Sequence, residues 1–175
     1  LLASSAASDV YKRQITMSKS VNLYVVVPCY NEEAVLHETS KQMLELFGEM
    51  KNDGLINDNS RIVFVDDGSK DKTWSIIDEL TKAHTEISGI KLAKNAGHQN
   101  ALFGGLMTVK DDCDCAISID ADLQDDIHVI PDMVRNFIDG YDVVYGVRNK
   151  RDTDTFFKRT TAVGFYKLMQ FMGVN

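Results

Sequence analysis

Short apolar runs rich in β-branched residues alternate with longer amphipathic runs from Asn22 onward. The strand candidates are residues 22–28, 61–67, 89–93, 115–120 and 141–146. Most of them are continuously apolar, the pattern of strands that are covered on both faces. The runs between them predict helices over residues 32–50, 71–84, 98–109 and 126–138. This series predicts an α/β fold with three layers, α/β/α, around a mostly parallel sheet.

Ligands of such sheets bind at the carboxyl ends of the strands, so the residues that follow each strand are the first place to look for a site. The chain of 175 residues, 44% of them hydrophobic, is long enough for one core. Its net charge of −7 argues against nucleic acid as a partner, because phosphate binding needs a basic surface.

The first strand is followed by "PCYNEE", residues 28–33. This segment has neither the G-x-G-x-x-G of a dinucleotide site nor the G-K-[ST] ending of a P-loop. Pro28 is expected to end the strand and Asn31 to cap the next helix. Those structural roles leave Tyr30 and Glu32 unexplained, and the Tyr30 ring could pack on a base or a sugar.

The second strand ends in "VDDGSKDKT", where Asp66 and Asp67 precede a turn at Gly68 and Asp71 can cap a helix. A carboxylate here could accept hydrogen bonds from a pyrimidine N–H or from ribose hydroxyls. An Asx-turn would account for one of the two aspartates. After the third strand, Gly97 and His98 favour a tight turn with a structural histidine over an anion site.

The fourth strand ends in "SIDADLQDD", residues 118–126. Asp120 and Asp122 flank Ala121, so in extended geometry both carboxylates point the same way, and Gln124 adds a neutral oxygen. Oxygen ligands without His or Cys suit Mg²⁺ or Mn²⁺ rather than zinc. A bound magnesium needs only one or two carboxylates when substrate phosphates complete its shell.

Two further features lie near this segment. Asp125 and Asp126 are expected to begin the next helix, where negative charge opposes the helix dipole favourably. Arg148 follows the fifth strand candidate, where a guanidinium could hold a diphosphate; the alternative is an ordinary surface arginine.

Taken together, five segments resemble family-2 glycosyltransferases of GT-A fold: "VVVPCYNEE", "VDDGSKDKT", "NAGHQNAL", "SIDADLQDD" and "VYGVRNKRD". More narrowly, they are similar to the polyprenyl-phosphate sugar transferases, the group of dolichol-phosphate mannose synthase and bactoprenol glucosyltransferase. The likeness runs from about Val21 to the end of the chain, in order. It implies inverting, metal-dependent transfer of a sugar from a UDP- or GDP-sugar to an undecaprenyl or dolichyl phosphate, as in cell-wall or lipopolysaccharide biosynthesis.

The resemblance also assigns residues. The donor nucleotide sugar would be bound by Pro28, Tyr30, Glu32, Asp66, Asp120, Ala121, Asp122 and Arg148. The metal, Mg²⁺ or Mn²⁺, would be held by Asp120, Asp122 and Gln124. The catalytic base is not assigned and is expected beyond residue 175. A transferase acting on a saccharide hydroxyl, and a non-catalytic nucleotide-sugar-binding fragment, stay open as alternatives.

Three regions are expected along the chain. Residues 1–16 resemble a non-native leader, residues 17–153 form the GT-A domain, and residues 154–175 form an amphipathic helix that stops without a capping signal, as in a truncated chain. That helix could lie on a membrane surface or face a core; the resemblance favours the cytoplasmic face of a membrane, with the full-length protein anchored there. The oligomeric state stays open, a homo-oligomer included.

Deleting residues 1–16 is expected to leave the melting temperature unchanged, because a non-native leader contributes no packed surface. Differential scanning calorimetry of the full and shortened chains checks this. A drop of several degrees in the shortened chain would show that these residues belong to the fold.

Overall fold

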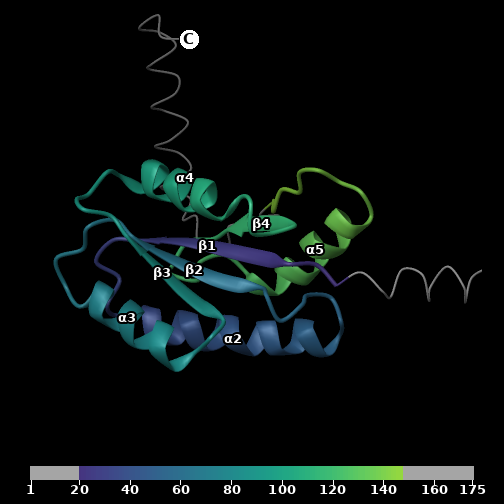
Figure 1. Ribbon diagram of the computed structural model, residues 1–175, viewed down its shortest axis with the longest axis horizontal. Coiled ribbons are helices and arrows are strands. Elements are labelled where there is room, and N and C mark those ends of the chain that lie inside the picture. Colours follow the sequence, from purple (N-terminus) through teal and green to yellow (C-terminus); the bar gives the residue numbers. More distant parts are fainter. Residues whose placement is uncertain (1–19, 148–175) are drawn as a thin grey trace, which may run out of the picture. The chain divides into compact units, whose positions relative to one another are not determined.

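The computed structural model describes residues 20–147. Four parallel strands form one sheet in the order β3-β2-β1-β4 (Figure 1). The strands are β1 (Leu23–Cys29), β2 (Arg61–Asp66), β3 (Ile87–Lys91) and β4 (Cys115–Ser118). The helices are α2 (Leu36–Asn52), α3 (Thr73–Ala83), α4 (His98–Val109), the 3₁₀ helix η1 (Ile127–Val129) and α5 (Ile130–Ile138).

Helices cover both faces of the sheet. On one face, α2, α3 and α5 pack against the sheet around the fully buried Phe47 and Phe64, with α3 next to β3 and β2 and α5 next to β4. On the other face, α4 packs against Val26, Val63 and Val65 (Figure 1). The predicted α/β fold with its three layers is therefore confirmed. Strands β1 and β2 are continuously apolar because both of their faces are covered.

Helix α4 lies unusually close to the sheet at Gly105. A Cβ atom at this position would lie 2.7 Å from Val26 Cγ1 and 2.7 Å from Val65 Cγ2. Both valines are completely buried, and their branched side chains have little rotational freedom. Only glycine therefore lets α4 approach β1 and β2 at this distance, which fixes where the start of the helix lies over the strand ends.

The strands differ from the predictions at several points, and β3 spans Ile87–Lys91 where residues 89–93 were expected. Pro28 does not end β1, which continues through Cys29. Strand β4 stops at Ser118, so Asp120 and Asp122 lie beyond the strand and not in it. In the described part of the chain residues 141–146 form no strand, and Tyr141 and Val143 are exposed. The composition favours a strand there, but a strand needs a hydrogen-bonded neighbour as well.

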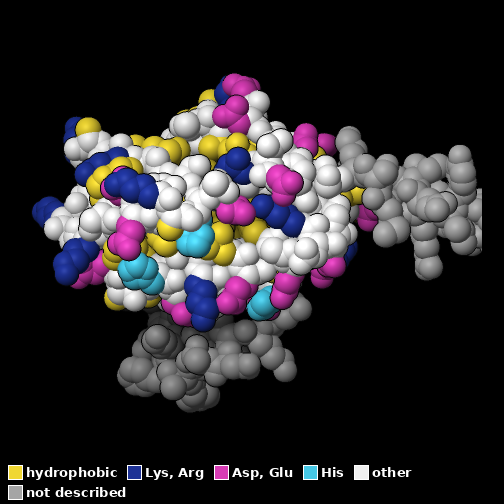
Figure 2. Space-filling view, turned by 60° about the horizontal axis from the view of Figure 1, so that its bottom comes forward, with side chains coloured by type: hydrophobic (Ala, Val, Ile, Leu, Met, Phe, Trp, Pro, Cys, Tyr) yellow, Lys and Arg dark blue, Asp and Glu magenta, His cyan; other side chains and the backbone are white. Residues whose placement is uncertain are grey.

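The face turned forward in Figure 2 carries acidic and basic side chains interspersed with one another, without one large region of a single sign. Within residues 20–147, no helix is both long enough and apolar enough to cross a membrane.

Gly105→Ala is expected to destabilise the fold by about 1–3 kcal/mol, because the added methyl overpacks a rigid core. The adjacent Gly104 is the matched control: a Cβ there meets nothing within 4 Å in the described chain. Gly104→Ala should stabilise by up to about 1 kcal/mol through helix propensity. Urea denaturation measures both changes, and equal effects would contradict the close approach of α4.

Candidate functional site

The strand order reverses at the carboxyl end of β1, the position where a ligand-binding crevice is expected in an open α/β sheet. The chain runs from β1 outward through β2 to β3 and then returns to place β4 on the other side of β1. In open α/β sheets, ligands bind where the strand order reverses in this way. The segments that follow β1 and β4 therefore flank the expected binding position, and the segment that follows β2 lies next to them.

Tyr30 lies just past β1 and is 42% exposed, whereas Pro28 is buried within the strand. Asn31 does not cap α2; it has a left-handed φ of 58°. Its side-chain Oδ1 accepts the N–H of Lys70 at 2.9 Å, and its own N–H donates to Ser69 Oγ at 3.0 Å. The helix cap predicted from sequence is wrong, because Asn31 joins the loop after β1 to the loop after β2.

A second set of hydrogen bonds connects the same two loops. The Glu32 N–H donates to Thr73 Oγ1 at 2.8 Å, and the Glu33 N–H donates to Asp71 Oδ2 at 3.2 Å. Asp71 also accepts the N–H of Thr73 through Oδ1, the bond expected at the start of α3. These bonds hold Glu32 at the rim of the crevice with its backbone fixed and its carboxylate partly exposed.

Asp66 is completely buried at the end of β2. Its Oδ1 accepts the N–H of Ser69 at 3.1 Å, in the expected turn. Its Oδ2 is buried and has no hydrogen-bond partner among the described residues. Leaving a buried carboxylate oxygen unpaired is costly, so such an atom points to a missing partner such as a ligand or a water.

Asp67 has a different role, which sequence reasoning did not find. It is also buried, but both of its oxygens are used: Oδ1 accepts the N–H of Ala96 at 2.6 Å and Oδ2 accepts the N–H of Gly97 at 2.9 Å. Gly68 adds to this connection, because a Cβ atom there would lie 2.7 Å from the backbone nitrogen of Asn95. The loop after β3 is thus held against the loop after β2.

The D-x-D segment is anchored through its middle residue. Ala121 is buried, and its carbonyl accepts the hydroxyl of Thr39 in α2 at 2.6 Å. Asp120 and Asp122 on either side are exposed. The N–H of Gln124 donates to Asp122 Oδ1 at 3.1 Å. Both carboxylates are therefore available at the crevice, although a turn and not the strand pleat presents them. Asp126 accepts the N–H of His128 and caps η1, so it begins the next helix as predicted.

His98 faces this segment. The predicted turn is present, with Gly97 at a φ of 89°, but the histidine is not enclosed in the core. Its side chain is 55% exposed, and its Nε2 lies 3.7 Å from Oδ1 of Asp120. Sequence spacing could not show this approach, since 22 residues separate His98 from Asp120.

Negative charge accumulates at these strand ends. The pKa of Glu32 is raised by partial burial and by the nearby carboxylates of Asp122, Asp71 and Asp120. The pKa of the Cys29 thiol is raised by burial and by Glu32 and Asp66. The first effect places Asp120 and Asp122 within electrostatic reach of Glu32. A cation would relieve this repulsion.

Comparison with known proteins identifies the fold and the family. Residues 24–173 match the family model described as glycosyl transferase family 2. The chain belongs to this family. Its resemblance to family-2 glycosyltransferases is thereby confirmed.

Several relatives are similar over most of the chain. The "uncharacterized glycosyltransferase YkoT" of Bacillus subtilis is 53% identical over 87% of this chain and 45% of that protein. The "prophage bactoprenol glucosyl transferase homolog" of Escherichia coli and the "bactoprenol glucosyl transferase" of Shigella phage SfV are each 39% identical over 85% of this chain and 46% of theirs. The chain thus spans about half the length of these relatives.

A solved structure shows the same fold. The mannosyltransferase PcManGT of Pyrobaculum calidifontis, in complex with GDP-Man and Mn²⁺, superposes with a TM-score of 0.56 over 74% of this chain and 39% of that one. At 18% sequence identity, this likeness supports the fold alone.

Asp120 and Asp122 fit a divalent cation whose remaining ligands are supplied by a substrate. Within the described ranges, no three His, Cys, Asp or Glu side chains converge to hold a metal ion unaided. Asp120 and Asp122 nevertheless offer exposed carboxylates, and both contribute to the raised pKa of the nearby Glu32. Two carboxylates suffice for Mg²⁺ when phosphate oxygens supply further ligands. Arg148 lies outside the described residues.

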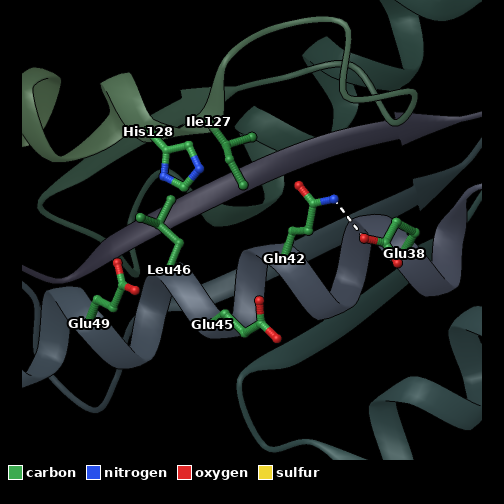
Figure 3. Close-up of a pocket in the computed structure, with 7 residues that line it drawn as sticks. All are labelled: Glu38, Gln42, Glu45, Leu46, Glu49, Ile127 and His128. Carbon is green, nitrogen blue, oxygen red and sulfur yellow. Dashed lines mark hydrogen bonds between the residues drawn. The ribbon is translucent and has the colours of Figure 1, made fainter.

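A separate groove of about 280 Å³ lies between α2 and the start of η1 (Figure 3). It is lined by Glu38, Gln42, Glu45, Leu46, Glu49, Ile127 and His128. None of the residues predicted to bind the donor lines it. His128 therefore belongs to a different surface from His98.

Glu32→Gln is expected to raise the melting temperature at pH 7, because the variant removes a charge that burial and neighbouring carboxylates disfavour. The raised pKa means that the folded state binds this proton more tightly, so the penalty disappears as the pH falls through that pKa toward the ordinary value of 4.5 and below. Thermal unfolding from pH 4 to pH 7 measures the difference.

The matched control is Glu45→Gln, on an exposed position of α2. Its effect on the melting temperature should be small at both ends of the range. A gain from Glu32→Gln that is the same at pH 4 and pH 7 would contradict the electrostatic explanation.

Proposed function

We propose that this chain is the donor-binding part of an inverting, divalent-metal-dependent glycosyltransferase that moves a sugar from a UDP- or GDP-sugar to a polyprenyl phosphate. The observation that carries the proposal is the meeting of acidic segments from β1, β2 and β4 at the reversal of strand order. The bactoprenol glucosyl transferases among the relatives support the lipid-phosphate acceptor.

The nucleoside would lie against the loops after β1 and β2. Asp66 Oδ2 is an acceptor without a described partner, which suits a base N–H or a ribose hydroxyl. Tyr30 offers an exposed ring just past the end of the neighbouring strand β1, and Pro28 is buried within that strand. Because Asp66 is fully buried, the residues that cover it would have to move slightly when the nucleoside binds.

The diphosphate would lie against the loop after β4. Asp120, Asp122 and Gln124 would hold Mg²⁺ or Mn²⁺ there, with the Ala121 backbone anchored by Thr39 beneath them. When bound, the cation would offset the negative charge that develops on the leaving nucleoside diphosphate. Arg148 is proposed to add a guanidinium to the same phosphates.

A lipid-phosphate acceptor would depend less on a catalytic base than a hydroxyl acceptor would. A phosphate monoester is already an anion, so it needs less activation than a hydroxyl, but it must approach an acidic site. Lys158, Arg159 and Lys167 in the segment 154–175, which lies outside the described residues, are proposed to supply positive charge at a cytoplasmic membrane surface. Residues 17–153 are proposed as the donor-binding domain.

Isothermal titration with UDP-glucose, GDP-mannose and UDP, each with and without Mn²⁺, tests the proposal. Asp122→Asn is expected to lose at least about tenfold in affinity, or about 1.4 kcal/mol, only when Mn²⁺ is present. Asp66→Asn should weaken nucleotide binding in both conditions, because it changes the nucleoside contact.

Asp111→Asn is the matched control, since Asp111 is exposed and precedes β4 at the opposite edge of the sheet. Its affinities should equal those of the parent. No heat of binding for any nucleotide in either condition would count against the whole proposal, and unchanged affinity in Asp122→Asn would remove the D-x-D segment from the site.

A further inference from the structure

We infer that His98 is a positioning residue of the donor site, which orients the carboxylate of Asp120 toward the bound cation and diphosphate. The inference rests on the proposed function and adds to it a residue from a fourth strand end. It concerns the first residue of α4, which the sequence suggested was only part of a turn.

The geometry brings the two side chains together across the sheet edge. His98 Nε2 lies 3.7 Å from Asp120 Oδ1, and the two side chains are 55% and 61% exposed. A hydrogen bond needs about 2.7–3.2 Å, which a small rotation of either exposed side chain provides. An imidazole that carries its proton on Nε2 would donate to Oδ1 and leave Oδ2 of the same carboxylate free for a ligand.

The position of His98 is built into the fold. Both oxygens of the buried Asp67 hold the N–H groups of Ala96 and Gly97, the two residues that precede it. Gly97 has φ 89° and ψ 149°, a backbone conformation that residues other than glycine rarely adopt. Gly105 then sets the close approach of α4 to β1 and β2. These contacts fix the backbone that places the His98 imidazole next to Asp120.

The negative charge near Asp120 explains why a contact with His98 would matter. Asp120 contributes to the raised pKa of Glu32, so a like charge also acts on Asp120. Because the Asp120 carboxylate is exposed and repelled by Glu32, it can turn away from the position proposed for the cation. A donor on the His98 side would hold it in place. Carboxylates that bind metals are commonly hydrogen-bonded in this way, and losing such a partner typically weakens metal binding about 10–100-fold.

The test uses the 175-residue chain, Mn²⁺, and either UDP or GDP, with free Mn²⁺ followed by electron paramagnetic resonance. His98→Leu removes the donor and is expected to weaken nucleotide-dependent Mn²⁺ binding about 10–100-fold without lowering the melting temperature. His98→Gln places an amide N–H near the position of Nε2 and is expected to restore most of the binding. His128→Leu, in the separate groove of Figure 3, should bind like the parent.

The outcomes separate the two claims. If the parent chain binds no Mn²⁺ with either nucleotide, the proposed function fails and the inference falls with it. If the parent binds and His98→Leu binds equally well, the inference alone is overturned. Equal losses in His98→Leu and His98→Gln, with nitrogen coupling in the spin-echo spectrum of bound Mn²⁺, would also overturn it, because His98 would then be a direct metal ligand.

Discussion

The pairing of β1 with β2 on one side and β4 on the other is the constraint on which the rest of the structure depends. Each pairing is parallel, so the carboxyl ends of the strands meet at one edge. Because β4 pairs with β1 on the side opposite β2, the loops after β1 and β4 lie next to each other at this edge. Segments about 90 residues apart in sequence therefore share one site.

The aspartates at this edge divide into two groups by what their oxygens bind. Asp67 and Asp71 use both carboxylate oxygens on backbone N–H groups: Asp67 binds the loop after β3, and Asp71 binds the loop after β1 and the start of α3. Asp66 keeps one oxygen without a described partner, and the carboxylates of Asp120 and Asp122 are exposed. The first group holds the loops together, and these loops and the segment after β4 present the second group.

This arrangement has an energetic cost that is consistent with a binding site. Glu32 carries a raised pKa because burial and three aspartates disfavour its charged form. The like charges around Glu32 lie at the edge where the strand order reverses. Elsewhere on the surface, in contrast, the carboxylate of Glu86 is paired with Lys51. Uncompensated like charges at functional sites are expected when a ligand or cation completes the balance.

Hydrophobic periodicity and turn residues are local signals, so the amino-acid sequence alone predicted the three-layer fold, the acidic strand ends, and the helices and first four strands to within a few residues. The site assignments at Tyr30, Glu32, Asp66 and the D-x-D segment remain predictions that the geometry accommodates. The long-range contacts became known from the three-dimensional structure: Asp67, and not Asp66, binds the loop after β3, and Asn31 joins two loops. The structure also showed that His98 faces Asp120 and that residues 141–146 have no strand partner in the described chain. Each of these depends on which distant segments become neighbours, and sheet order sets that through long-range pairing which local composition does not encode.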